Sequence, residues 1–150
     1  MKTKFILILF CGYLFSSCDN RGHSLAFNLQ KQVFYSCDSS PIRNLSIRND
    51  SITIDGLSIE GAMLISWDGN VDDEIAKEIS VSEIPKNYKF TKGGLKADKS
   101  DYKLRGNSAY LIEKFGGGKS SFYLRIWTDS TGKVFKTTHP ECGLKSLQND

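Results

Sequence analysis

The 150-residue sequence is poor in the residues on which most recognisable catalytic and metal sites depend. It contains two histidines, four cysteines and three prolines, and it has no Ser-His-Asp spacing and no nucleophile elbow. The uncharged apolar run at residues 5–15 has 11 residues, whereas a membrane-spanning helix needs roughly 20. The formal charge of +3 is too small for a dedicated nucleic-acid binder. We therefore expect one non-enzymatic globular domain with no cofactor, no metal and no nucleic-acid partner.

Two segments begin like ligand-binding loops but do not continue as such loops. Residues 116–120 read Gly-Gly-Gly-Lys-Ser, yet Glu113 occupies the position of the first glycine of a phosphate-binding loop. Residues 68–72 begin like a calcium loop, but Asp73 and Ile79 replace the glycine and the bidentate glutamate that such a loop requires. A hairpin turn and a helix cap explain the two segments better.

The N-terminus has the pattern of an export signal. Lys2 and Lys4 precede the apolar run, and Leu-Phe-Ser-Ser-Cys at residues 14–18 resembles the lipobox of bacterial lipoproteins. The resemblance implies cleavage before Cys18, a lipid on its thiol, and anchorage in the bacterial cell envelope facing the periplasm or the cell surface. Secretion without a lipid is the alternative, although Phe15 disfavours an ordinary cleavage site.

Processing at Cys18 would divide the chain into three parts. These parts are a signal peptide at 1–17, a short polar tether at 18–24 and a single β-rich domain at 25–150. Cys37 and Cys142 would then be the remaining pair of thiols, and outside the cytoplasm we expect them to form a disulfide. A metal site and a nucleophilic cysteine are the competing interpretations of the pair.

The clearest strand pattern lies between residues 42 and 60. Three alternating apolar pairs are separated by the dipeptides at 49–50 and 55–56, and the second of these, Asp-Gly, is favoured in two-residue hairpin turns. We expect a three-stranded meander in which consecutive strands pair and all apolar side chains share one face. The expected facing pairs are Ile47 with Ile52, Leu45 with Ile54, Ile54 with Leu57, and Ile52 with Ile59.

Strand-like patterns recur along the rest of the mature chain. Further strands are expected at residues 25–30, 33–37, 61–67, 88–90, 102–104, 108–115, 120–128 and 133–138. One short helix is expected from Asp72 to Ile79, because Ile75 and Ile79 would share a face and acids would cap the first turn. Residues 91–101 are expected to form a mobile loop. The predicted fold is therefore mostly β, a small antiparallel β-barrel or sandwich with one short helix.

Two blocks of opposite charge are adjacent in the sequence. Residues 66–85 carry a net charge of −5, and residues 86–105 carry a net charge of +5. Such polarity can steer a charged protein partner and raise its association rate, and Lys92, Lys96 and Lys99 are the candidate contact residues. A solvated helix beside a solvated lysine-rich loop would have the same composition.

A second candidate surface follows from the alternation in residues 122–128. If Phe122, Leu124 and Ile126 fill the core, the opposite face carries Tyr123, Arg125 and Trp127. Tyrosine, arginine and tryptophan are the residue types enriched at interface hot spots. A second layer of structure over this face would instead make the three residues part of the packing.

Together these observations favour a protein-binding lipoprotein of the cell envelope, held to a membrane by its N-terminal lipid. Within that class we favour an inhibitor or immunity protein directed against a toxin or a wall-degrading enzyme. Residues 33–38, Val-Phe-Tyr-Ser-Cys-Asp, are similar to the first strand of the membrane-bound lysozyme inhibitors, a family of lipid-anchored small β-barrels. The glycine-rich inhibitory loop of that family has no counterpart in this sequence. A structural or assembly lipoprotein and a small-ligand carrier are the alternatives.

Overall fold

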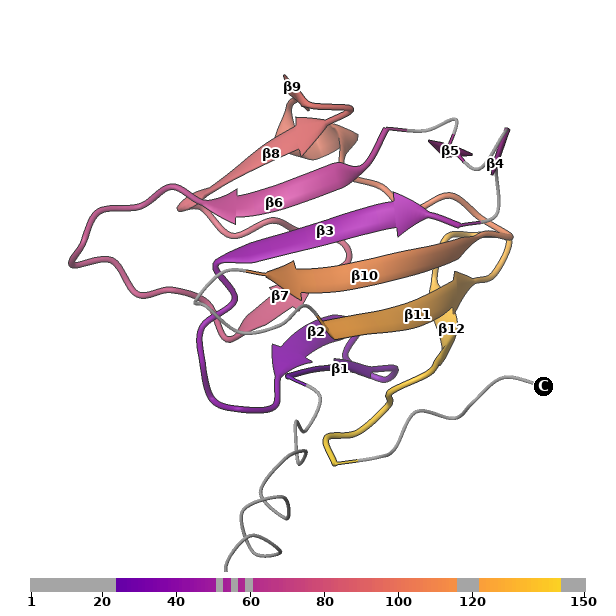
Figure 1. Cartoon of the computed structure of the whole chain (residues 1–150), viewed down its shortest axis with the longest axis horizontal. Coiled ribbons are helices and arrows are strands. Elements are labelled where there is room, and N and C mark those ends of the chain that lie inside the picture. The colour runs from indigo at the N-terminus through magenta and orange to yellow at the C-terminus, as the bar shows by residue number, and fades with distance from the viewer. Residues whose placement is uncertain (1–23, 51–52, 55–56, 59–60, 116–121, 144–150) are drawn as a thin grey trace, which may run out of the picture.

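The computed structural model of the chain describes residues 24–50, 53–54, 57–58, 61–115 and 122–143. Within these ranges the protein consists of antiparallel strands and one turn of 3-10 helix, η1, at Lys99–Asp101 (Figure 1). The strands are β1 (Leu25–Asn28), β2 (Val33–Ser36), β3 (Asn44–Asn49), β4 (Thr53–Ile54), β5 (Leu57–Ser58), β6 (Met63–Trp67), β7 (Glu78–Ser80), β8 (Tyr88–Lys92), β9 (Leu95–Lys96), β10 (Ala109–Phe115), β11 (Phe122–Thr128) and β12 (Val134–Thr137).

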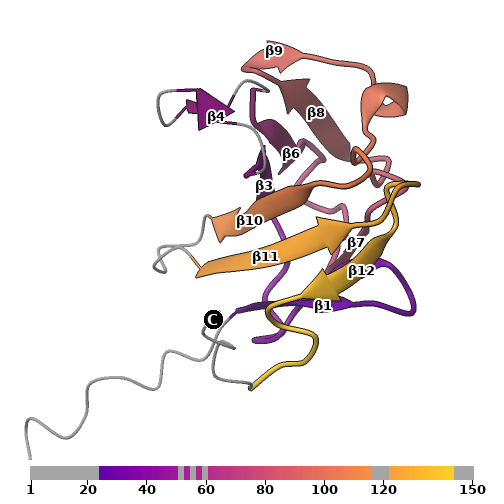
Figure 2. The ribbon, with the colours of Figure 1, turned by 90° about the vertical axis from the view of Figure 1, so that its right-hand side faces the viewer.

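The strands form two main sheets. The larger sheet has seven strands in the order β12-β11-β10-β3-β6-β8-β9, and the smaller has three in the order β1-β2-β7. The hairpin of β4 and β5 pairs with neither sheet and follows the end of β3 (Figures 1 and 2). The predicted antiparallel, mostly β fold is confirmed. Of the two predicted architectures the structure is the sandwich, because the described strands do not close into a barrel.

The core lies between the two sheets and is formed by alternate side chains that point inward. The seven-stranded sheet contributes Leu45, Ile47, Ile65, Ile112, Leu124 and Ile126, all of them at most 1% exposed. The small sheet contributes Phe27 and Phe34, whose rings meet edge to face with their centroids 4.8 Å apart. Because β11 alternates, burial of Leu124 and Ile126 turns the residues between them to the outer side of the sandwich.

The predicted meander of residues 42–60 is wrong in its first half. β3 pairs with β10 on one edge and with β6 on the other, so neither edge is left for the strand that follows it. These neighbours are longer than the two-residue β4 and place apolar residues beside Ile47 on the core face. The predicted pairing of Ile54 with Leu57 is confirmed. The other two facing residues of the prediction, Ile52 and Ile59, lie outside the described residues.

The predicted helix from Asp72 to Ile79 is also wrong. Residues 71–73 form a turn, and the chain then runs into β7, which pairs with β2. Ile79 is fully buried opposite Phe34, and the carbonyl of Lys77 accepts a hydrogen bond from the amide of Ser36. A helix of two turns is marginal in isolation, so pairing with an available strand edge outweighs the helical pattern.

Residues 91–101 form a defined hairpin and a helical turn where a mobile loop was expected. Gly93 and Gly94 join β8 to β9 with φ values of +59° and +81°, the positive values that a type I′ turn requires at both positions. The strand expected at 102–104 is irregular in the structure. Tyr102 is nevertheless 3% exposed, because its ring packs against the core beneath β8.

Candidate functional site

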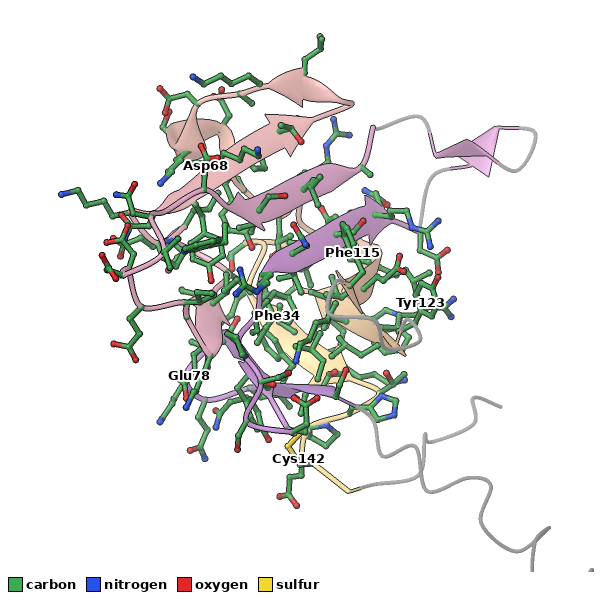
Figure 3. All side chains as sticks on the ribbon, turned by 60° about the vertical axis from the view of Figure 1, so that its left-hand side comes forward. Phe34, Asp68, Glu78, Phe115, Tyr123 and Cys142 are labelled. Carbon is green, nitrogen blue, oxygen red and sulfur yellow. A yellow bond between two sulfur atoms is a disulfide. The ribbon has the colours of Figure 1, made fainter. Side chains whose placement is uncertain are left out.

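The outer face of β11 carries the three residues predicted from the alternation of residues 122–128. Tyr123 is 45% exposed, whereas Arg125 and Trp127 are half-buried on the same side of the strand. Tyr123 and Phe115 lie at the outer side of the sheet, away from the buried Phe34 (Figure 3). No described strand forms a second layer over this side of the sheet.

A β-bulge in the edge strand β12 enlarges this surface. Trp127 pairs with Lys136 and Thr128 pairs with Val134, so Phe135 is the additional residue of β12. The bulge turns both Phe135 and Lys136 outward, and Phe135 is 59% exposed. We call the surface formed by Tyr123, Trp127 and Phe135, together with Arg48, Arg125 and Lys136, the outer aromatic face. No pattern in the sequence indicates the exposure of Phe135, because the bulge depends on the partner strand.

Each cation of the outer aromatic face is held by a specific neighbour. The ammonium of Lys136 lies 4.5 Å from the centroid of the Trp127 ring, and the guanidinium of Arg48 lies 6.0 Å from that of Tyr123. Each such cation–π contact stabilises the pair by about 0.5–1 kcal/mol at an exposed site. Arg125 Nη2 lies 2.6 Å from Asp50 Oδ2, an ion pair between the middle of β11 and the residue that follows β3. The contacts orient these long side chains before any partner arrives, which lowers the entropic cost of binding.

A hollow lies at the end of the outer aromatic face where β11 finishes and β12 begins. Its volume is about 390 Å³, and it is lined on its apolar side by Trp127, Phe135 and Ala109. Asn107 and Asp129 are among the polar residues that line its remaining side. An apolar hollow with a polar margin is the kind of site in which an anchoring side chain of a partner can be buried.

The predicted lysines do not lie beside the outer aromatic face. Lys92 and Lys96 are exposed on the β8–β9 hairpin, and the strands β10, β3, β6 and β8 separate β9 from β11. The ammonium of Lys99 donates hydrogen bonds of 2.8 Å to the carbonyls of Pro85 and Lys86. Lys99 therefore fastens η1 to the start of β8, and its charge is already engaged within the fold.

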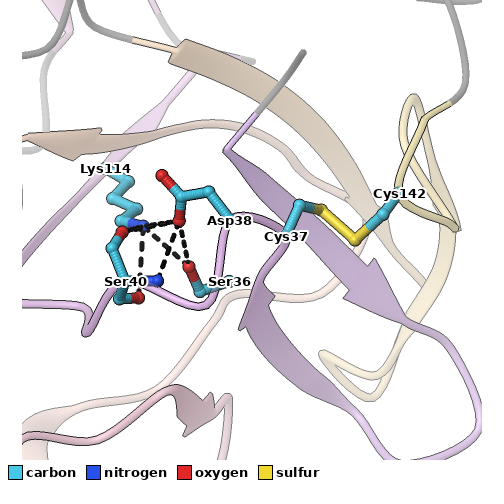
Figure 4. Close-up of polar contacts among 6 residues, drawn as sticks. All are labelled: Ser36, Cys37, Asp38, Ser40, Lys114 and Cys142. Atoms are coloured by element: carbon cyan, nitrogen blue, oxygen red, sulfur yellow. Dashed lines mark hydrogen bonds and ion pairs between the residues drawn. A yellow bond between two sulfur atoms is a disulfide. The ribbon is translucent and has the colours of Figure 1, made fainter.

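The sequence prediction misses a polar cluster around Lys114. This lysine is 8% exposed, and its Nζ lies 2.8 Å from Ser36 Oγ, 2.7 Å from Ser40 Oγ and 3.2 Å from Asp38 Oδ1 (Figure 4). A signal was present, because the alternation of β10 puts Lys114 on the same inward side as the buried Ile112. A lysine at an inward position of a strand requires polar partners.

Lysine beside serine hydroxyls is also the arrangement of Ser-Lys hydrolases, in which a neutral amine accepts the proton of the serine. In this structure Asp38 forms an ion pair with the Lys114 ammonium and also accepts hydrogen bonds from the hydroxyls of Ser36 and Ser40. A charged ammonium has no lone pair with which to accept a proton. The geometry therefore supports a structural role, in which the cluster ties the loop after β2 to β10.

The predicted disulfide between Cys37 and Cys142 is confirmed. Its Cα atoms lie 5.4 Å apart, and it joins residues separated by 105 positions in the sequence. The segment before Cys142 runs along β1, where the amide of Phe27 donates a hydrogen bond of 2.9 Å to the carbonyl of His139. The hydroxyl of Tyr35 donates to the carbonyl of Pro140, and burial raises the pKa of this hydroxyl above its ordinary value.

The predicted lipidation site, Cys18, lies outside the described residues, so the lipid anchor stays a prediction. In the described part of the chain, no helix has the length and apolar composition needed to cross a membrane. The same residues contain no group of three or more His, Cys, Asp or Glu side chains placed to hold a metal ion.

Comparison of the chain with family models, with curated proteins and with solved structures gave no match.

Proposed function

We propose that this chain is a protein-binding module of the bacterial cell envelope, anchored through a lipid on Cys18, and that the outer aromatic face is its binding surface. The observation that carries the proposal is the exposure of Tyr123 and Phe135 beside Trp127 on a sheet face that no other described strand covers. Within this class we favour an inhibitor or immunity protein that occludes the active site of a toxin or a wall-degrading enzyme.

The composition of the face supports a protein as the ligand. Aromatic residues and arginine supply most of the energy at protein interfaces, and here each cation is already oriented by a ring or a carboxylate. A presented sheet face also suits occlusion, because it offers a broad surface to a partner. A carrier that binds its ligand inside a barrel is not supported, because the described strands leave the sandwich open.

Site-specific photo-crosslinking in intact cells tests the proposal. The photoreactive residue p-benzoylphenylalanine replaces Phe135 in the full-length chain, and a matched control carries it in place of Val71, which is 96% exposed on the β6–β7 loop. We expect a discrete protein adduct from position 135 and none from position 71. Equal adducts from both positions, or no adduct from position 135, would refute the proposed surface.

The identity of the cross-linked protein separates the inhibitor from an assembly lipoprotein. An inhibitor should yield one enzyme or toxin, and the purified mature chain should suppress its activity at a molar ratio near one. An assembly lipoprotein should yield several non-enzymatic envelope proteins, and adding the chain would change no activity. The second result would support the proposed binding surface but assign the protein an assembly role in place of the inhibitor role.

A further inference from the structure

Five exposed bases of the described residues lie at one end of the seven-stranded sheet. β3, β8 and β11 finish at this end, and β6, β10 and β12 begin there, as the antiparallel pairings require. We call this group the basic end, and its members are Arg48, Lys92, Lys103, Arg105 and Lys133. Lys92, Lys103 and Arg105 belong to the basic sequence block at residues 86–105, and Arg48 and Lys133 join them from other segments.

Three members of the basic end surround one small cavity. Lys92, Lys103 and Arg105 line it together with the buried amide side chain of Asn49, and its volume is about 30 Å³. A cavity of this volume accommodates a water-sized polar group. The amide of Arg105 donates a hydrogen bond of 2.6 Å to the hydroxyl of Tyr110, which holds this segment against β10.

The described carboxylates near the basic end are already engaged. Asp50 forms the ion pair with Arg125 described above. Asp129 Oδ1 accepts hydrogen bonds from the amide of Thr131 at 2.8 Å and from the amide of Lys133 at 3.1 Å. These bonds, together with one from the Thr131 hydroxyl, lower the pKa of Asp129 and keep it ionised within its own turn.

The opposite end of the sheet carries charges of both signs. Asp68 follows the end of β6, and the loop after it carries three further exposed or half-buried acids, Asp72, Asp73 and Glu74. Exposed bases lie at the same end, namely Arg43, Lys77, Lys86 and Lys89, and Lys89 Nζ lies 3.5 Å from Asp68 Oδ1. Among the described residues the acids at this end offset the bases, so net positive charge is concentrated at the basic end, where it can orient an approaching partner.

The membrane tether joins the domain at the end opposite to the basic end. The carbonyl of Ser24, which ends the tether, accepts a hydrogen bond of 3.0 Å from the amide of Cys37. The neighbouring Ser36 contacts Lys114, the penultimate residue of β10, and β10 finishes at the end opposite to the basic end. The strand β10 is about 20 Å long, so a lipid on Cys18 would attach to the domain about that far from the basic end.

We infer that the basic end receives an acidic surface of a protein partner, and that one oxygen of a partner carboxylate enters the cavity between Lys92, Lys103 and Arg105. The inference rests on the proposed function and states the chemistry of the partner. Arg48 belongs to both the basic end and the outer aromatic face, so one partner can cover them together. Anionic lipid headgroups are the other class of polyanion in an envelope, but the tether joins the domain at the opposite end, so the domain would have to turn over for the basic end to meet the anchoring membrane.

The test compares two triple variants of equal charge in the full mature chain. One variant combines Lys92→Glu, Lys103→Glu and Arg105→Glu, and the matched control combines Lys77→Glu, Lys86→Glu and Lys89→Glu at the opposite end of the sheet. The first probe is poly-L-glutamate at low salt, and its binding is monitored by changes in the backbone amide NMR shifts of the protein. We expect shifts at residues 92, 103 and 105 that the first variant abolishes and the control retains. Shifts centred on 77, 86 and 89, or no shifts, would overturn the inference.

The second probe is the protein that cross-links at position 135. The basic-end variant should lower its association rate constant at least tenfold at low salt, and the control variant less than twofold. If Trp127→Ala abolishes binding while the basic-end variant binds as wild type, the inference fails and the proposed function stands. If no protein cross-links, both fail. Binding to phosphatidylglycerol vesicles that the basic-end variant alone loses, with unchanged partner binding, would assign the surface to lipid and overturn the inference.

Discussion

Replacement of Lys114 by methionine removes the charge at the centre of the polar cluster while keeping an unbranched apolar stem. The ammonium loses its contacts with Ser36, Asp38 and Ser40. Asp38 keeps three hydrogen bonds, from the two serine hydroxyls and from the amide of Ser40 at 3.1 Å. One oxygen of the Asp38 carboxylate, Oδ1, therefore keeps its hydrogen-bond donors after the substitution.

The expected cost follows from this partial compensation. Breaking a fully buried ion pair costs about 3–5 kcal/mol, but the Asp38 side chain is 24% exposed and keeps its other donors. We expect Lys114→Met to lower the free energy of unfolding by about 1–3 kcal/mol in urea denaturation of the purified protein. The control Lys92→Met changes an exposed lysine and should stay within about 0.5 kcal/mol of wild type. A Lys114→Met chain as stable as the control would refute the structural role of the cluster.

Three further predictions concern the fold. Replacing Cys37 and Cys142 by serine should lower the free energy of unfolding by up to about 4–5 kcal/mol, which is the chain-entropy value for a loop of this length. Equal urea midpoints for the variant and wild type would contradict this expectation. Gly61→Ala should cost about 1–3 kcal/mol, because its Cβ would overlap the backbone of Gly93, and an unchanged thermal midpoint would count against that packing. Burial raises the pKa of Tyr88 above 10.0, so the free energy of unfolding should keep its full value below pH 10 and fall as the pH rises further. In urea titrations, Tyr88→Phe should lose less of this free energy at alkaline pH than wild type. An identical loss in both proteins would exclude Tyr88 as its source.

Local alternation predicted most of the strands and the direction of their side chains. The pattern of β11 placed Leu124 and Ile126 in the core and Tyr123 on the outside, as the structure shows. The pairing of Ile54 with Leu57 followed from the turn between them. These features depend on residues close in sequence, which is why one sequence is enough to predict them.

The features that could not be predicted depend on segments that are distant in the sequence. The position of β3 between β6 and β10 depends on residues up to about 70 positions away, as the pairing of Asn44 with Phe115 shows. The strand β7 replaces a helix because β2 offers a free edge, and no local pattern reports that edge. The exposure of Phe135 likewise depends on a bulge opposite Trp127. The sequence therefore predicted the residues of the candidate surface that lie on β11, but only the structure shows that Phe135 of β12 belongs to it.

The central claim is that the outer aromatic face binds a protein, and the affinity of Trp127→Ala for the protein cross-linked at position 135 tests it most directly. Trp127 lines the hollow and holds Lys136, so its truncation removes the anchor of the face. We predict a dissociation constant at least 30-fold above wild type, about 2 kcal/mol, with the β-sheet circular dichroism spectrum retained. Val71→Ala, on the exposed loop, should bind as wild type. Equal affinities for the Trp127→Ala and Val71→Ala chains would contradict the account.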